Sequence, residues 1–370
     1  MLNTYIKTNK MIEFTRYLYL KKHVYTAFIA AVLTKNKDEA LFWIFELYHS
    51  GYRSDAMSAL WCTYYGFYAS QNALLEAYMK KKLPKEPKYE EDIHFMITFV
   101  SNLMIRNYNL DVFLLSGVAN KTEEDEDTKT ATLMERLESR DYESLAYYMN
   151  TIYQDKKKLT SATKTLKEYF EKQGLKKVPA FTGKCDDVCD IVIILARIMS
   201  CFMQLDETDN KKKKNLYVSA DENIAKNYET IEVSEEDPRP DKLFQKLVKY
   251  SPNNLELLSV FCPSQPEILP EYQSNWVKYG YQYTPIWKER IEAYGGVFNE
   301  EKDCIEWEDD EKEEDFYSQY GYDIDEQPVE VQNKNIPLYD KRMSLEEFYN
   351  KYRKNGLYVP CTEMLEALTD

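Results

Sequence analysis

The chain has 370 residues, a net charge of −15 and a hydrophobic content of 44%, which excludes a wholly disordered protein. With 32 Tyr but only 10 Gly and 13 Pro, it lacks the turn residues that a many-stranded β protein or a phosphate-cradling α/β enzyme needs. The acidic total also disfavours nonspecific binding to nucleic acid, which depends on cations.

The first 205 residues predict a helical domain. Between Asp38, a candidate N-cap, and Gly51, a candidate left-handed residue, apolar side chains follow the spacing of one helix face. Ser54 is a candidate cap for a second helix, and we interpret the many rings here as wedges between stacked helices. Further helical segments are expected at 13–35, 72–82, 89–106, 110–118, 130–154, 161–173 and 186–204. Together they predict an irregular helical bundle or an α-solenoid-like domain over 1–205.

Beyond this domain the sequence changes character. A polar stretch at 206–240 predicts a linker, followed by a C-terminal region at 241–370 with short helices, one of them at 242–250. A β-hairpin is expected at 296–307, and the chain from 310 to 340 is expected to be extended or partly disordered. A last helix begins after Ser344, where Glu347 completes a capping box. The predicted fold class is mainly α, with a smaller, mixed and partly extended C-terminal region.

Charge is distributed unevenly along the chain. An acidic arm at 298–330 carries fifteen Asp and Glu against two Lys, which accounts for most of the net charge of −15. A basic segment at 155–184 carries nine Lys against three acidic residues. Such a segment is typical of a solvated helix face, and it could also contact a phosphate backbone. The candidate nucleic-acid contacts are Lys156, Lys157, Lys158, Lys164 and Lys167.

Residue types that carry catalysis are few. The 3 His lie in predicted helices, and we interpret each as structural. Cys185, Cys189 and Cys201 lack the fourth ligand of a structural zinc site, and the acidic cluster around Asp310 lacks the rigid scaffold that magnesium requires. The sequence contains no P-loop, dinucleotide-binding, nucleophile-elbow or HExxH motif. We therefore expect no cofactor, no metal and no enzymatic activity.

The C-terminal region carries residues that are typical of recognition. Large aromatic side chains lie next to proline-rich chain, and acidic residues follow. The candidate partner-binding residues are Trp276, Tyr279, Tyr283, Trp287, Trp307, Glu308, Asp309, Asp310, Glu313 and Glu314. The same rings would also serve to dock the C-terminal region onto the helical domain.

Cysteine usage and hydropathy indicate a compartment. Seven Cys without tight spacing are typical of reduced thiols in the cytosol, and the N-terminus is too polar for a signal peptide. The most apolar stretch, Ile191–Met203, has thirteen residues, fewer than the about twenty that a membrane span needs. We expect a soluble, intracellular protein without a membrane partner.

Three stretches resemble an uncharacterised protein family of nucleocytoplasmic large DNA viruses, of the mimivirus and algal-virus kind. They are "DEALFWIFELYHSGY", "PIWKERIEAYGG" and "EEDFYSQYGYDIDEQP". The resemblance implies a viral protein in the host cytoplasm (the viral factory) or in the virion, and it assigns no chemistry. The leading hypothesis is a non-enzymatic adaptor or scaffold that binds other proteins. Two alternatives are an accessory subunit of viral transcription, replication or translation that contacts nucleic acid through 155–184, and a minor virion structural component.

Overall fold

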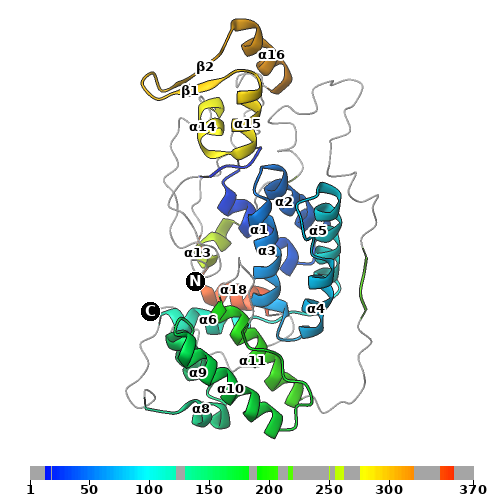
Figure 1. Cartoon of the computed structure of the whole chain (residues 1–370), viewed down its shortest axis with the longest axis vertical. Helices are drawn as coiled ribbons and strands as arrows, with labels where there is room; N and C mark the ends of the chain where they lie inside the picture. Colours follow the sequence, from blue (N-terminus) through cyan, green and yellow to red (C-terminus); the bar gives the residue numbers. More distant parts are fainter. Residues whose placement is uncertain are drawn as a thin grey trace. The chain divides into compact units, whose positions relative to one another are not determined.

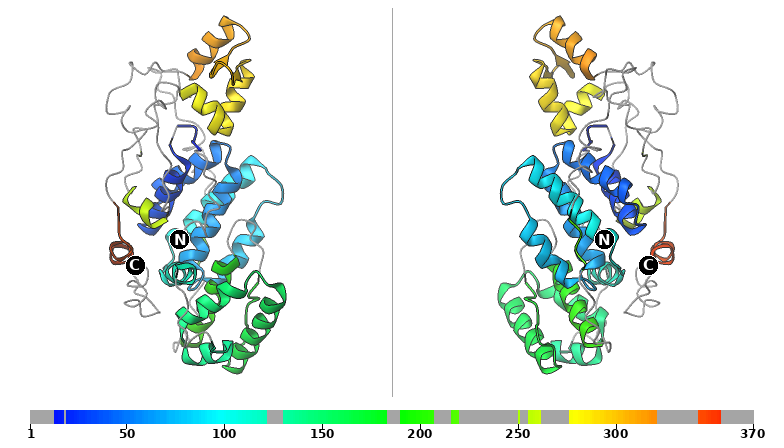
Figure 2. Two further views of the ribbon diagram at one scale, coloured as in Figure 1. Left: turned by 90° about the vertical axis from the view of Figure 1, so that its left-hand side faces the viewer. Right: turned by 90° about the vertical axis from the view of Figure 1, so that its right-hand side faces the viewer.

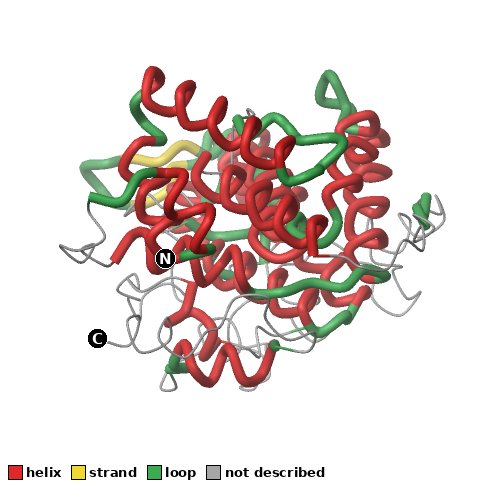
Figure 3. Tube along the Cα trace, turned by 90° about the horizontal axis from the view of Figure 1, so that it is seen from below, coloured by secondary structure: helices red, strands yellow, loops and turns green. Residues whose placement is uncertain are grey.

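The computed structural model of the chain describes residues 13–17, 19–121, 130–182, 190–206, 216–219, 250, 255–261, 276–320 and 342–353. Of these residues, 70% are helical, in 15 α-helices, one π-helical turn and one 3₁₀ turn, and one small two-stranded sheet lies near the C-terminal region (Figure 1; Figure 3). The predicted mainly α fold is confirmed.

The chain divides into two compact units, each assembled from segments far apart in the sequence. Unit 1 comprises Met1–Lys7, Leu60–Ser219 and Met343–Asp370, and unit 2 comprises Thr8–Ala59 and Ala220–Arg342. Of the predicted linker at 206–240, the structure describes only 206 and 216–219. The division into 1–205 and 241–370 therefore remains a prediction.

Unit 2 begins with two helices that pack along each other, α1 (Lys21–Leu33) and α2 (Lys37–His49). The N-cap of α2 is Asn36, whose side chain accepts from the Glu39 amide, so the prediction of Asp38 as cap was wrong. Asn36 has an extended backbone, whereas Asp38 already lies inside the helix. Gly51 has φ +89°, which confirms the predicted left-handed residue after the helix. The next helix, α3 (Arg53–Thr63), begins one residue before the predicted cap.

The C-terminal part of unit 2 contains η3 (Leu255–Leu257) and α13 (Leu258–Phe261), which contact α1, and then a compact group of short elements. These are α14 (Trp276–Tyr283), α15 (Pro285–Ala293), β1 (Val297–Asn299), β2 (Cys304–Glu306) and α16 (Asp310–Tyr320). Strands β1 and β2 pair antiparallel, which confirms the predicted hairpin at 296–307.

Helix α16 corrects the expectation of an extended chain from 310. Its charged residues conceal a helical spacing, because Phe316 and Tyr320 lie four residues apart and pack their rings together, with centroids 5.4 Å apart. Phe316 is fully buried, so the acidic helix has an apolar side that fixes it to its neighbours. Of the predicted helix at 242–250 the structure describes only Tyr250, which is not helical, and the rest of the acidic arm, 321–330, lies outside the described residues.

The regular secondary structure in the described residues of unit 1 is helical. After α3 the chain forms a π-helical turn, η1 (Tyr64–Tyr68), followed by α4 (Ala73–Lys82), α5 (Tyr89–Met104) and α6 (Asp111–Lys121). Then come α8 (Leu133–Ser139), α9 (Tyr142–Ile152), α10 (Lys156–Lys172) and α11 (Asp190–Asp206), which lie side by side in both views of Figure 2. The predicted segment 130–154 divides into two helices because Arg140 adopts a left-handed conformation, φ 56°.

The last helix of unit 1, α18 (Leu345–Tyr352), joins a core formed more than 200 residues earlier. Its capping box between Ser344 and Glu347 is confirmed. Phe348 packs on Phe113 with ring centroids 5.5 Å apart, and the Tyr108 hydroxyl donates to the Tyr352 carbonyl at 3.0 Å. Burial of these rings therefore fixes α18 to α6 and its neighbours.

Helix α11 contains the apolar stretch that is too short to cross a membrane. Its residues from Ile191 to Ala196 are buried, and Arg197 donates to Glu76 at 2.7 Å and to the Ala180 carbonyl at 2.6 Å. Among the described residues, no helix combines the length and the apolar character that a membrane span requires.

Candidate functional site

The aromatic side chains of the first half form the cores of both units. In unit 2, Trp43 is fully buried and its ring lies edge-on to Tyr19 at 5.3 Å. In unit 1, Trp61 packs edge-on against Phe99 at 4.9 Å, and the rings of η1 are all buried. These contacts agree with the interpretation of the rings as wedges between helices.

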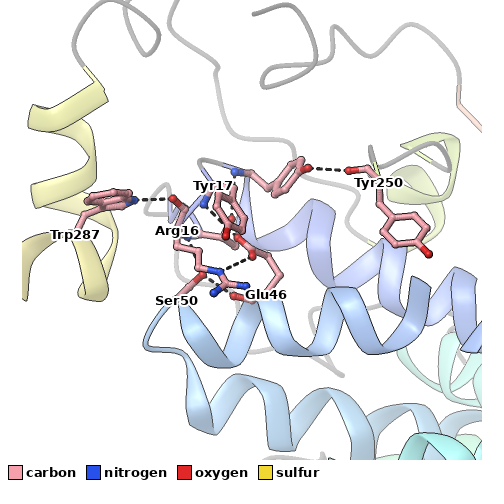
Figure 4. A network of polar contacts seen from close by, with 8 residues as sticks. Arg16, Tyr17, Glu46, Ser50, Tyr250 and Trp287 are labelled. Atoms are coloured by element: carbon pink, nitrogen blue, oxygen red, sulfur yellow. Dashed lines mark hydrogen bonds and ion pairs between the residues drawn. The ribbon is translucent and has the colours of Figure 1, made fainter. Parts of the chain in front are cut away.

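The predicted aromatic anchors of the C-terminal region largely serve packing within unit 2. Trp287 is fully buried, and its indole Nε1 donates to the Arg16 carbonyl at 2.8 Å (Figure 4). Tyr279 is buried, while Tyr283 is half-buried and its carbonyl accepts from the Phe14 amide at 3.0 Å. Trp307 is half-buried against Phe316 at 4.9 Å. This placement agrees with the alternative in which the rings dock the C-terminal region.

Trp276 begins α14, and its side chain is not among those that the structure describes.

Beside Trp287 lies a buried polar network that the sequence analysis missed. The Arg16 guanidinium donates to Glu46 at 2.9 Å, and Glu46 also accepts from the Tyr17 amide at 3.2 Å (Figure 4). Ser50 accepts from the Arg16 amide at 2.7 Å. Glu46 is 0% exposed, so this carboxylate is stabilised by charge-assisted bonds instead of water. The network holds the segment before α1 against α2, and Trp287 bonds the same segment.

The acidic candidates lie on and just before α16. Glu308, Asp309, Asp310 and Glu314 are exposed and Glu313 is half-buried. Asp309 caps the helix by accepting from the Lys312 amide at 2.8 Å, and Lys312 forms an ion pair with Glu308. The exposed carboxylates at positions 310, 311, 314 and 315 share one side of the helix, which we call the acidic face. Because Phe316 anchors the opposite side, the helix holds the backbone positions of these four charges in a fixed array.

The basic candidates lie on the solvent side of α10. All five predicted lysines are exposed, while Leu166 and Phe170 bury the opposite side of the helix. Lys164 and Lys167 have carboxylates one turn away, Glu168 at 3.7 Å and Glu171 at 3.8 Å. Both ion pairs are exposed, so they hold the lysines weakly and leave them accessible to a phosphate.

The residues of these two faces include no histidine and no cysteine. Burial lowers the pKa of His23 to about 4, so this imidazole is neutral in the folded protein at pH 7. His49 lies in the last turn of α2, and His94 is half-buried in α5. Cys201 is buried, which raises the pKa of its thiol to about 12, whereas Cys185 and Cys189 lie outside the described residues. Within the described ranges, no group of three or more His, Cys, Asp and Glu is placed to hold a metal ion.

A second feature that the sequence analysis missed is a short extended segment, Leu216–Ser219, which lies against α4 and α5 in unit 1. The Asn102 side chain bonds both backbone groups of Val218, donating to its carbonyl at 2.7 Å and accepting from its amide at 3.2 Å. Tyr217 stacks on Tyr78 with ring centroids 4.2 Å apart. A sequence separation of 116 residues between the bonded groups leaves no local signal for this contact.

The protein is mainly helical, and two of its helices, α10 and α16, have a charged side exposed to solvent and an opposite side that buries aromatic rings. In comparisons with known proteins, no family model, no curated protein and no solved structure matches the chain.

Proposed function

We propose that this chain is a non-enzymatic adaptor or scaffold that binds a basic protein partner through the acidic face of α16. The observation that carries the proposal is the fixed presentation of Asp310, Glu311, Glu314 and Asp315 on a helix whose other side is held by Phe316. Fixed charges of one sign recognise an opposite pattern without the ordering cost that a flexible acidic tail would have on binding.

The electrostatics of this face predict how binding responds to salt. Four exposed carboxylates on one helix side attract a cationic partner over a distance of about 8–10 Å at physiological salt. Raising the ionic strength should therefore slow association more than it speeds dissociation.

The test removes half of the charge of the face without removing the helix. The variant Glu314→Gln/Asp315→Asn keeps the first turn of α16, where carboxylates favour the helix dipole. In pull-downs from infected cells with a tagged chain, we expect partners to be lost from this variant and retained by a control with Glu86→Gln/Glu138→Gln, two exposed carboxylates of unit 1. Equal recovery of partners by both variants would refute a role for the acidic face.

A second candidate function, contact with nucleic acid, is supported by the exposure of Lys156, Lys157, Lys158, Lys164 and Lys167 on one helix. Phosphate binding by these lysines would give an affinity that falls linearly with salt on a logarithmic scale. Charge reversal of Lys157 and Lys164 should then weaken binding to RNA or DNA and flatten the salt dependence of the binding that remains. Binding that is unchanged by the reversal would eliminate this candidate.

The setting that we propose rests on the resemblance to proteins of large DNA viruses. It is the cytoplasm of an infected cell or the virion, and a minor structural role in the particle is the third candidate. Mass spectrometry of purified particles would separate the two settings.

A further inference from the structure

We propose that Tyr78, Asn102 and Arg106 of unit 1 form a recognition site for an extended peptide segment with an aromatic residue, and that the chain's own Leu216–Ser219 occupies this site as an intramolecular competitor. The site lies in the other unit from the acidic face and uses different chemistry. It therefore stands or falls independently of the proposed function.

Asn102 binds the backbone of the segment Leu216–Ser219. Its amide nitrogen donates to the Thr98 carbonyl and to the Val218 carbonyl, both at 2.7 Å. Its amide oxygen accepts from the Val218 amide at 3.2 Å and from Arg106 at 2.9 Å. All four hydrogen-bonding positions of this side chain are thus used, and the bonds to Thr98 and Arg106 fix its orientation. Two of these four hydrogen bonds are made to Val218, a residue of an extended chain. A neighbouring β-strand would bond the amide and the carbonyl of such a residue in the same way.

Arg106 and Tyr78 contact Tyr217, the residue before Val218. Arg106 lies four residues after Asn102, just beyond the end of α5, and donates to the Leu216 carbonyl at 2.7 Å. Its guanidinium lies 5.3 Å from the centroid of the Tyr217 ring, and the Tyr78 ring stacks on Tyr217 with an interplanar angle of 21°. A stacked ring together with a nearby cation selects an aromatic residue at this position. The preferred ligand is therefore an extended segment with a Tyr or Phe whose neighbouring backbone groups are available.

The occupying segment is held by few contacts. Leu216 is 66% exposed, and Tyr217 and Val218 are only half-buried, so the side chains flanking the ring contribute little burial. Three bonds to the backbone of the segment, one bond of 3.4 Å from the Tyr217 hydroxyl to the Leu74 carbonyl and one ring stack hold it. An extended chain with a tyrosine at this position can reproduce them. Because the segment belongs to the same chain, it competes at an effective concentration in the millimolar range. A partner that supplies additional contacts elsewhere would displace it.

The experiment uses the full-length chain and a labelled octapeptide with the sequence of residues 214–221, and binding is followed by fluorescence anisotropy. An opened chain, Tyr217→Ala/Val218→Pro, loses the ring and the amide that hold its own segment. We expect the opened chain to bind the peptide at least tenfold more tightly than the unaltered chain does, because the tethered copy no longer competes. Circular dichroism should show the same helix content for both chains.

Peptide variants test the contacts without altering the protein. N-methylation of the valine removes the hydrogen that Asn102 accepts, and a Tyr→Ala peptide removes the ring. Each change should weaken binding to the opened chain about tenfold. A Leu→Ala peptide is the matched control and should bind as the parent does, since Leu216 is mostly exposed.

The opened chain carrying Asn102→Ala should also bind the parent peptide about tenfold more weakly. Absence of saturable binding to the opened chain would show that the segment is only a structural part of unit 1. Equal binding of the parent, N-methyl and Tyr→Ala peptides would also overturn the proposal.

Discussion

In each unit, hydrogen bonds between a side chain and the backbone connect segments that are far apart in the sequence. We call each of these connections a join, and the two joins differ in their surroundings. In unit 2, Trp287 bonds the Arg16 carbonyl, and the indole is fully buried beside the Arg16–Glu46 ion pair. In unit 1, Asn102 bonds Val218, but the segment that it holds remains half exposed. A buried join would leave polar groups without partners if it opened, whereas water can replace the partners of an exposed one. We therefore infer that the first join is permanent and the second exchangeable.

The largest effect should follow from removing a charge at the permanent join. Glu46→Gln keeps the size of the side chain but leaves the Arg16 guanidinium without its carboxylate in a buried site. The free energy of unfolding of unit 2 should fall by about 3–5 kcal/mol. Hydrogen exchange of α1 and α2, measured across a denaturant series, reports this loss separately from unit 1.

The matched control for this charge removal is Glu91→Gln, which breaks an exposed ion pair with Lys88. Its effect should stay below about 1 kcal/mol. If the two substitutions cost the same, the buried network contributes no more than a surface pair, and the contrast between the two joins loses its basis.

Acid should weaken unit 2 through His23. Burial lowers the pKa of this imidazole from the ordinary 6.5 to about 4, so between these pH values the unfolded chain binds a proton that the folded chain does not. Stability is therefore complete above about pH 6.5 and declines as the pH falls to about 4, by about 3 kcal/mol from this group. The difference in pH dependence between the unaltered chain and His23→Leu measures the effect. Identical pH profiles would show that His23 binds its proton equally readily in the folded and the unfolded chain.

The sequence predicted the local structure well where one short pattern determines it. Periodic apolar residues placed α2, Gly51 ended it, and the capping box of Ser344 placed α18. The charge density of 310–315 concealed α16, because the helix depends on Phe316 and on rings that lie elsewhere in unit 2. Local pattern therefore accounts for the elements better than for what they contact.

The polar contacts of the candidate sites could not be predicted in this way. Arg16 and Glu46 are 30 residues apart, and Asn102 and Val218 are 116 residues apart. No property of either residue type selects its partner before the fold brings them together. By contrast, the exposure of the α10 lysines follows directly from the apolar spacing of Leu166 and Phe170 on the same helix.

Alanine substitutions at two glycines should distinguish the cost of backbone strain from the cost of close packing against α15, the helix that carries Trp287. Gly51 and Gly174 have similar positive φ angles, +89° and +99°. An alanine that adopts such a backbone conformation costs about 1–2 kcal/mol of stability. A Cβ on Gly51 would lie 2.7 Å from Cβ of Pro285 at the start of α15, whereas nothing lies within 4 Å of one on Gly174. We expect Gly51→Ala to cost about 1–3 kcal/mol more than Gly174→Ala in hydrogen-exchange stability. Equal costs would show that α15 moves freely over this turn.

The smallest effect on stability should come from the exchangeable join. Tyr217→Ala removes the ring that stacks on Tyr78, yet the core of unit 1 does not depend on it, so the amides of α5 should lose less than about 1 kcal/mol of protection. The Val218 amide, which donates to Asn102, should in contrast exchange as rapidly as in an unfolded chain. Trp287→Phe provides the comparison in unit 2, because it removes the bond to Arg16 and part of a fully buried ring, and it should reduce protection throughout α15. If Tyr217→Ala destabilised α5 as much as Trp287→Phe destabilises α15, the segment 216–219 would be part of the core of unit 1, and no partner could displace it without unfolding that unit.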